Sequence, residues 1–154
     1  VSETQGRDAA CEKVIHKEAP FDALIHCGDV EEREDYYEAL LDVPYYQVAG
    51  NCDLWSDLPG EAVASICGVR VFITHGHSYN VSYGEEIVAE AAVSRDCRVV
   101  CYGHTHRPSV DQYAGVITIN PGSLEFPRQP NHKPSYAVLD ITKDGRISAE
   151  IRYL

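Results

Sequence analysis

The chain has little positive charge. Its 154 residues carry 13 lysine and arginine side chains against 24 aspartate and glutamate, which gives a formal net charge of −11. Nucleic-acid-binding surfaces are normally basic, and anionic lipid attracts basic segments, so we expect no nucleic-acid surface and no membrane contact. A small phosphate-ester substrate is still compatible with this composition, because bound metal ions can reverse the charge of a local site.

Long apolar runs and closely paired cysteines are also missing. No apolar run reaches the roughly 18 residues of a transmembrane helix, and no signal peptide is recognisable. The six cysteines include no Cys-x-x-Cys pair, and four of them lie in apolar runs: Cys27, Cys67, Cys97 and Cys101. We interpret these four as reduced thiols that pack as small apolar groups in a cytoplasmic protein. A disulfide or zinc framework is the alternative.

The sequence contains no methionine, and its length is that of one domain. We therefore expect a single domain over residues 1–154. Val1 and Ser2 resemble the end of a strand that runs into a turn, so most of this first strand is expected to lie before Val1.

Helix-like and strand-like segments alternate along the chain. Apolar spacing predicts helices over 8–18, 31–44 and 83–95, the last with a capping-box sequence from Ser82 to Glu85 and a core stripe of Ile87, Val88, Ala91 and Ala92. Strands are predicted over 21–28, 45–50, 69–75 and 97–102, with another directly before Gly68. Strand pairs follow near 109–113, 115–120, 135–141 and 146–153. This order predicts an α/β fold of two packed sheets with helices on the outer faces.

Polar side chains recur where the predicted strands end. They are Asp29, Asn51, His75, His77, His104 and His106, and a glycine adjoins nearly every one. Ligands of open α/β sheets bind at the carboxyl ends of the strands, so we expect these groups at one rim. Carboxylate, amide and imidazole suit Mn, Fe or Zn, and two ions about 3.5–4 Å apart could hold a phosphate and activate water. Alone, each residue is more often a turn or surface group, and only their ordered recurrence favours a site.

The ordered series IHCGDV, VAGNCD, ITHGH, YGHTH and INPGS…PR resembles the calcineurin-like metallophosphoesterases, and more closely the YfcE-type phosphodiesterases. The resemblance covers nearly the whole chain. It implies a four-layer αββα sandwich, with two mixed β-sheets flanked by helices. It also implies two divalent metal ions, usually Mn, with Fe, Ni, Co or Zn as alternatives, and phosphodiester hydrolysis by a hydroxide that these ions activate.

The resemblance assigns roles residue by residue. Asp29 would bridge the two ions, and His106 would bind the first of them. The second ion's shell would be completed by Asn51, His75 and His104. Asn51 could also contact the phosphate. Cys52 stands where many relatives have a histidine that assists the leaving group, so no general acid is assigned.

Three further features adjoin these motifs. His77 lies two residues after His75 and would share its side if the strand continued, which makes it a candidate for substrate contact. Arg128 could reach an anionic substrate, and a solvated surface role is as compatible with its position. The turn NPGS at 120–123 is interpreted as a structural support for the site.

The first residues depart from the family pattern. Relatives begin with Asp-x-His, and both residues bind the first metal, whereas this chain has Glu3-Thr4-Gln5. Glutamate keeps the charge at a longer reach. Glutamine offers a neutral amide oxygen in place of an imidazole nitrogen, which weakens a transition-metal site. We therefore expect a first metal site, formed with Glu3 and Gln5, that is weaker than the second.

Two alternatives remain open. A protein-binding scaffold of the same fold, as in the retromer subunit, is favoured by the altered first ligands. Its surface could be aromatic, although the same residues would suit the core or a homo-oligomer contact: Tyr36, Tyr37, Tyr45, Tyr46 and Trp55. A redox-sensitive enzyme is a weaker alternative, because Cys27 and Cys52 each adjoin a proposed ligand.

Overall fold

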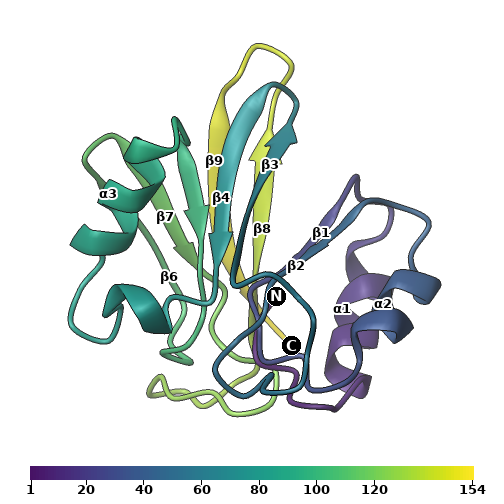
Figure 1. Ribbon diagram of the computed structural model, residues 1–154. Coiled ribbons are helices and arrows are strands. Elements are labelled where there is room, and N and C mark those ends of the chain that lie inside the picture. The colour runs from purple at the N-terminus through teal and green to yellow at the C-terminus, as the bar shows by residue number, and fades with distance from the viewer.

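Buried apolar side chains form three separate clusters in the computed structural model, which describes residues 1–154. These clusters lie between four layers of secondary structure (Figure 1). Helix α3 (Glu86–Ser94) forms one outer layer, and helices α1 (Ala9–Glu18) and α2 (Glu34–Leu40) form the opposite one. Strands fill the two inner layers. The expected four-layer α/β sandwich is therefore confirmed.

The inner layer beside α3 is a five-stranded mixed sheet. Its order is β3 (Glu61–Ile66), β4 (Val69–Thr74), β5 (Val99–Cys101), β7 (Val116–Asn120) and β6 (Ser109–Tyr113). The three central strands are parallel, and the two edge strands are antiparallel to their neighbours. Along β4, Val71 and Ile73 face the other strand layer, while Phe72 packs towards α3. Burial on both faces explains why these strands read as continuous apolar runs.

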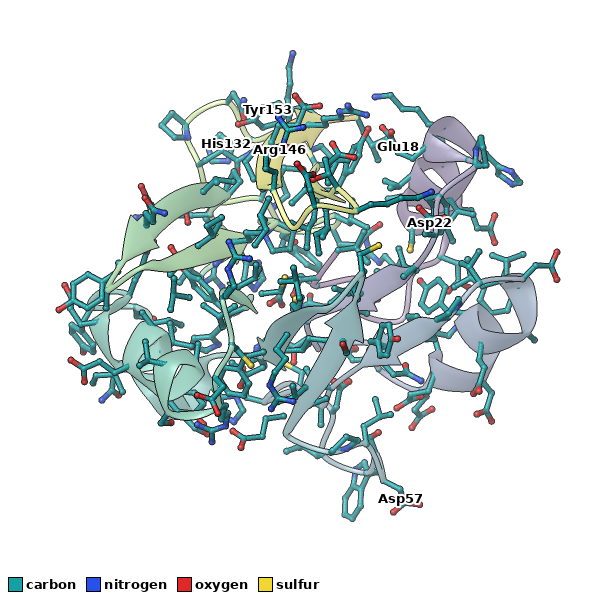
Figure 2. All side chains as sticks on the ribbon, turned by 90° about the horizontal axis from the view of Figure 1, so that it is seen from above. Glu18, Asp22, Asp57, His132, Arg146 and Tyr153 are labelled. Carbon is teal, nitrogen blue, oxygen red and sulfur yellow. The ribbon has the colours of Figure 1, made fainter.

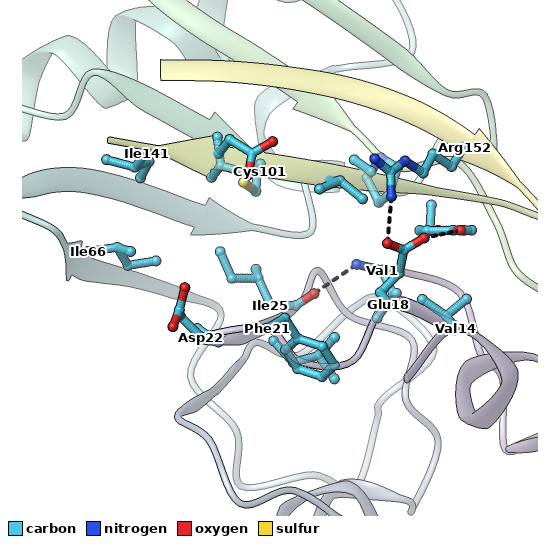
Figure 3. Close-up of a pocket in the computed structure, with 18 of the residues that line it drawn as sticks. Val1, Val14, Glu18, Phe21, Asp22, Ile25, Ile66, Cys101, Ile141 and Arg152 are labelled. Atoms are coloured by element: carbon cyan, nitrogen blue, oxygen red, sulfur yellow. Dashed lines mark hydrogen bonds and ion pairs between the residues drawn. The ribbon is translucent and has the colours of Figure 1, made fainter. Parts of the chain in front are cut away.

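The second strand layer is not one mixed sheet, contrary to expectation. It consists of a parallel pair, β1 (Leu24–His26) with β2 (Tyr45–Gln47), and an antiparallel hairpin, β8 (Ser135–Ile141) with β9 (Ile147–Tyr153). The chain at Val1 runs beside β1, where its amino group donates to Ile25 O at 2.8 Å and its carbonyl accepts from Cys27 N at 2.9 Å. A largely apolar cavity of about 440 Å³ is lined by residues of both β1 and β8, which do not pair with each other (Figure 3).

The observed elements are shorter than predicted at several ends. The helix predicted over 83–95 begins at Glu86, and no capping box forms, because the Glu85 carboxylate instead accepts hydrogen bonds from Tyr102 and Thr118 of the sheet region. Ala89 is buried in the helix core in place of Ile87, which is 49% exposed. Cys67 is exposed at the β3–β4 turn rather than packed.

The connection from β2 to β3 extends to the periphery of the molecule, where Asp57 marks its outer part (Figure 2). The helices are short, and none has the length and apolarity needed to cross a membrane. All six cysteines are free thiols.

Replacing Ile73 with alanine should lower the free energy of unfolding by about 2–5 kcal/mol, because the deletion leaves a cavity between the strand layers. The same change at Ile87, which is half-exposed on α3, should cost less than about 1 kcal/mol. Urea unfolding of both variants measures the difference. Equal losses would contradict the assigned helix face.

Candidate metal centre

The carboxyl ends of four strands supply the predicted polar residues. Asp29 follows β1, Asn51 follows β2, His75 follows β4 and His104 follows β5. Glu3 joins them from the N-terminal segment, whose N–H groups pair with the loop after β1: Glu3 N donates to Gly28 O at 3.1 Å and Gln5 N donates to Asp29 O at 3.0 Å. The expected common rim is thus present in the structure.

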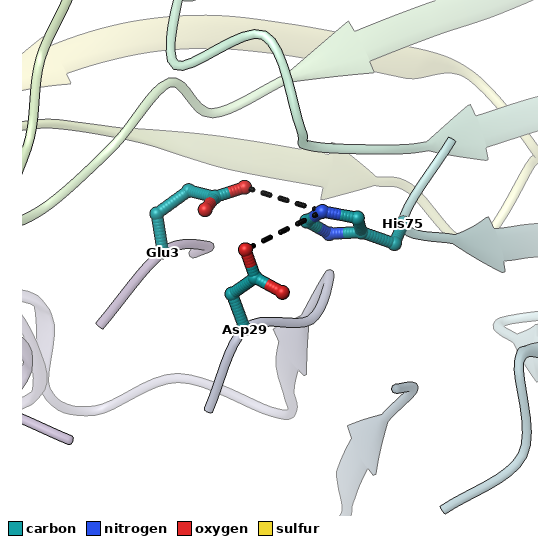
Figure 4. Close-up of side chains that lie close together, drawn as sticks. All are labelled: Glu3, Asp29 and His75. Carbon is teal, nitrogen blue, oxygen red and sulfur yellow. Dashed lines mark ion pairs between the residues drawn. The ribbon is translucent and has the colours of Figure 1, made fainter. Parts of the chain in front are cut away.

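Glu3, Asp29 and His75 form the buried centre of this rim (Figure 4). Each offers one potential ligand atom, and these atoms lie within 4.8 Å of one another. His75 Nε2 is 3.7 Å from Glu3 Oε1 and 3.6 Å from Asp29 Oδ2. Two buried carboxylates close to each other are unfavourable unless a positive charge lies between them.

The tautomers of two histidines are fixed by backbone carbonyls. His75 Nδ1 donates to Cys27 O at 2.8 Å, and His106 Nδ1 donates to Phe126 O at 2.7 Å. In each neutral ring the lone pair is therefore on Nε2. That atom faces carboxylate oxygens, in His106 at 3.0 Å from Glu3 Oε2. Two acceptors that face each other are unfavourable unless a proton or a metal ion lies between them. Histidines oriented by their other nitrogen are typical metal ligands.

Asn51 connects the imidazole of His104 to the centre. Its Oδ1 lies 2.9 Å from His75 Nε2 and 2.9 Å from His104 Nδ1. His104 is also fixed through its backbone N–H, which donates to Glu3 Oε1 at 2.8 Å. The donor set of carboxylate, amide oxygen and imidazole fits a divalent transition metal.

Local charges shift the pKa values of the site. Burial lowers the pKa of His106, but the Glu3 carboxylate and the Phe126 carbonyl together outweigh burial, so the pKa is raised overall. Burial and the neighbouring His75 lower the pKa of His104 and of His77. Burial opposes ionisation of Asp29, yet His75 and the N–H of Cys52 hold the pKa of this carboxyl below its ordinary value. The lowered pKa therefore favours the ionised carboxylate form of Asp29.

The backbone at the site is strained. Five of the seven proposed ligands have positive φ: Glu3 (59°), Gln5 (45°), Asp29 (56°), His104 (70°) and His106 (58°). Such conformations are uncommon outside glycine and gather at functional sites. Gly50 has a different role from these positive-φ residues. It is required for close packing, since a Cβ at this position would lie 2.0 Å from Asp29 Oδ1.

Three predicted residues lie further from the centre. The Gln5 side chain makes no hydrogen bond to the cluster. His77 is exposed, and it stays near the site although β4 ends at Thr74, because a turn at Gly76 brings its ring within 5.4 Å of the His75 ring. Arg128 is exposed and adjoins His106 through its backbone N–H, which donates to His106 O at 3.0 Å.

The turn at 120–123 supports the site as predicted. Asn120 donates to Gly103 O and to Thr105 Oγ1, which holds the loop that carries His104. Ser123 accepts from Phe126 N at 2.8 Å, next to the carbonyl that orients His106. The redox alternative gains no support, because burial raises the pKa of Cys27 to about 11 and, together with Asp29, that of Cys52 to about 12.

Sequence reasoning missed Asp53. Its side chain is buried and accepts backbone hydrogen bonds from the loops that carry Asp29 and Asn51. The only signal was an acidic residue two positions after Asn51, which is also typical of an ordinary turn.

Comparison with known proteins defines the family. The model of the calcineurin-like phosphoesterase superfamily domain matches residues 3–144, so the chain belongs to this superfamily. It is 32% identical over 146 residues to a probable metallophosphoesterase, YsnB, of Bacillus subtilis, covering 94% of this chain and 84% of that protein. It is 39% identical over 71 residues to the phosphodiesterase YfcE of Escherichia coli, covering 46% and 34% of the two chains.

Solved structures share the fold. A predicted phosphoesterase from Streptococcus pneumoniae superposes with a TM-score of 0.80 at 24% identity and covers 100% of this chain and 95% of its own. Vps29 from Entamoeba histolytica, in complex with Zn²⁺, gives a TM-score of 0.73 at 20% identity, covering 95% and 88%. The expected resemblance to metallophosphoesterases is confirmed.

Replacing Gly50 with alanine should weaken Mn²⁺ binding by about 10-fold to 100-fold, because the new methyl group displaces the Asp29 carboxylate. Gly60 is the matched control, since a Cβ at that position would meet no atom within 4 Å. Calorimetric titration of both variants with Mn²⁺ measures the change. Equal affinities would show that Asp29 tolerates the displacement.

Replacing Glu3 with glutamine should lower the pKa of His106 in the metal-free protein, because burial then acts without the opposing carboxylate. The exposed Asp57, changed to asparagine, controls for the loss of one negative charge. Imidazole resonances followed by NMR against pH report the pKa. An unchanged titration in the Glu3→Gln variant would exclude Glu3 as the cause.

Proposed function

We propose that this protein is a metal-dependent phosphodiesterase with a two-ion site. One observation carries the proposal: the Nε2 lone pairs of His75 and His106 both face carboxylate oxygens, with each ring held by a backbone carbonyl. This arrangement supports cation binding more directly than any single residue type. Mn²⁺ is the proposed metal, and a cytoplasmic location remains part of the proposal.

The side chains fall into two groups, which supports two ions rather than one. Glu3 and His106 approach each other on one side, while His75 and His104 both adjoin Asn51 on the other. Asp29 lies nearest His75 and is the proposed shared carboxylate. When bound, the ions would polarise a phosphate and make a water acidic enough to supply the nucleophile.

The residues of the chain would then have separate tasks. The carboxylates of Glu3 and Asp29 bind the ions, and the three imidazoles complete their shells. Asn51 is the proposed phosphate contact because it is exposed beside the cluster. His77 and Arg128, both exposed near the centre, are the proposed groups that orient the substrate.

A diester is the favoured substrate on electrostatic grounds. Glu31, Glu32, Glu34 and Asp53 line a hollow beside Cys52, so the surface next to the Asp29 and Asn51 loops is acidic. A singly charged phosphodiester is repelled less there than a doubly charged monoester. The similarity to a protein named as a phosphodiesterase agrees with this choice.

The first metal site is the proposed weak one. Glu3 is fully buried and reaches both His75 and His106, so the longer carboxylate still serves this site. Gln5 contributes only a backbone hydrogen bond to Asp29 O. A neutral amide at this position would leave the first ion with fewer strong ligands.

A scaffold role is the second candidate. Leu54 and Trp55 are 77% and 90% exposed and adjoin each other on the β2–β3 connection, which is unusual for large apolar side chains. Vps29, which was solved in complex with Zn²⁺, shares this fold. The fold alone therefore does not separate the two functions.

Metal counting with turnover tests the proposal. Protein soaked in Mn²⁺ and desalted should retain two ions per chain by elemental analysis and hydrolyse an aryl phosphodiester. His75→Ala should lower kcat/KM roughly 100-fold or more, because it removes a ligand. His132→Ala, at an exposed histidine outside the cluster, is the control. Absence of both bound metal and turnover in the wild-type protein would overturn the proposal in favour of the scaffold.

Restoring the family's ligands tests the weak first site. The double variant Glu3→Asp, Gln5→His should bind its first ion about 10-fold more tightly, because imidazole replaces a neutral amide. Competitive titration against a fluorescent chelator measures the two affinities. A double variant that binds no more tightly than the wild type would show that the first site is already complete.

A further inference from the structure

The Asp53 carboxylate is an anion enclosed by backbone N–H groups. Its Oδ2 accepts from Asp29 N at 2.8 Å, from Val30 N at 3.2 Å and from Gly50 N at 2.8 Å. Its Oδ1 accepts from Glu31 N at 2.7 Å. The side chain donates no hydrogen bond and approaches no cationic group. These four bonds are therefore what satisfies the carboxylate, which is only 8% exposed.

Three of the four donors are consecutive. Asp29, Val30 and Glu31 present their N–H groups to one side because the chain around them is left-handed, with φ of 56° at Asp29 and 52° at Glu31. Successive N–H groups in such a conformation form an anion-binding nest. In most nests the anion is a ligand, whereas here it is a side chain from the next loop of the same protein.

The fourth donor joins this nest to the second loop. Gly50 N belongs to the β2 end that carries Asn51, and Asp53 N donates back to Gly50 O at 3.2 Å. Cys52 N, between them, donates to Asp29 Oδ1 at 2.9 Å. The two loops are therefore held against each other by charge-assisted bonds, which are roughly twice as strong as neutral ones.

We propose that Asp53 is the positioning residue of the metal centre: its carboxylate fills the nest at Asp29–Glu31 and fixes the Asp29 and Asn51 loops at one separation. The effect on metal binding rests on the proposed metal site, whereas the anchoring of the two loops does not. Asp53 itself touches neither metal nor substrate in this role. It acts through the direction of the Asp29 carboxylate.

Graded substitutions test this role. In Asp53→Asn, one oxygen becomes an NH₂ group, so at least one N–H donor loses its acceptor and faces another donor. We expect Mn²⁺ affinity to fall about 10-fold in Asp53→Asn and up to about 100-fold in Asp53→Ala. Asp57→Asn and Asp57→Ala, at an exposed carboxylate in the same connection, should leave the affinity unchanged.

Amide hydrogen exchange gives a readout without metal. In the metal-free Asp53→Asn variant, exchange at Asp29, Val30, Glu31 and Gly50 should accelerate by about 10-fold or more, while the sheet amides of β4 and β5 stay protected. A uniform acceleration through the whole chain would indicate general destabilisation, and unchanged exchange at the four amides would overturn the proposal.

Chemical rescue separates positioning from mere folding. Asp53→Ala leaves an empty nest that opens on the hollow beside Trp55, so formate should enter it and restore Mn²⁺ affinity at matched ionic strength. Chloride should restore less, and Asp57→Ala should not respond to either salt. If Asp53→Ala is unfolded, the asparagine variant carries the test alone.

The two proposals fail in different ways. A wild-type protein that binds no metal contradicts the proposed function, while the exchange experiment still judges the role of Asp53. A wild-type protein that binds Mn²⁺ with the same affinity as folded Asp53→Asn and Asp53→Ala contradicts the positioning role alone. Loss of affinity in Asp53→Ala without any recovery in formate also contradicts it, provided that the variant is folded.

Discussion

The placement of imidazole lone pairs against buried carboxylates is the constraint on which the functional rim depends. His75 and His106 each give their Nδ1 proton to a backbone carbonyl, so only Nε2 is available to the site. Glu3 and Asp29 present oxygens to those atoms from a buried position. A positive charge satisfies all of these groups at once, which explains why the chain tolerates acceptors that otherwise oppose one another.

The fold supplies this geometry through the ends of parallel strands. Each of the four strands concerned is only three to six residues long, and a glycine follows each strand end after two or three residues. The stiff parts of the protein therefore end within a few residues of the site. The loops are then held by polar side chains, Asp53 on one flank and Asn120 with Ser123 on the other. Strain at five proposed ligands is offset by these contacts and by the packed layers beneath.

The acidic composition of the chain has a different effect at this rim than on the rest of the surface. A chain with net charge −11 would repel phosphate almost everywhere, yet a site that gathers divalent cations reverses the sign where the substrate must bind. The same negative surroundings favour ions of higher charge and substrates of lower charge. Members of the superfamily share the fold, so the distinction between an enzyme and a scaffold lies in these side chains and not in the layers that support them.

Much of the site could be predicted from the sequence because its residues follow strand ends at regular places. The order of Asp29, Asn51, His75 and His104 needed only local patterns and one rule about parallel sheets. The sheet pairs of the C-terminal part were also placed correctly, since alternation and turn residues are local signals. Helix boundaries were less predictable: Glu85 has the sequence of a capping residue, but the sheet hydroxyls of Tyr102 and Thr118 bind its carboxylate instead.

Only the tertiary structure decided which neighbours each group meets. Glu3 lies between two histidines that follow it by more than 70 residues in the sequence, and no local pattern predicts that these side chains meet in space. His77 was expected beside His75 by strand alternation, and it lies there because of a turn at Gly76. The sequence by itself determined the chemical types and their order along the chain, because those depend on local spacing. The three-dimensional packing decided the tautomers, the burial and the enclosure of Asp53, because these depend on atoms that the chain brings together only when it folds.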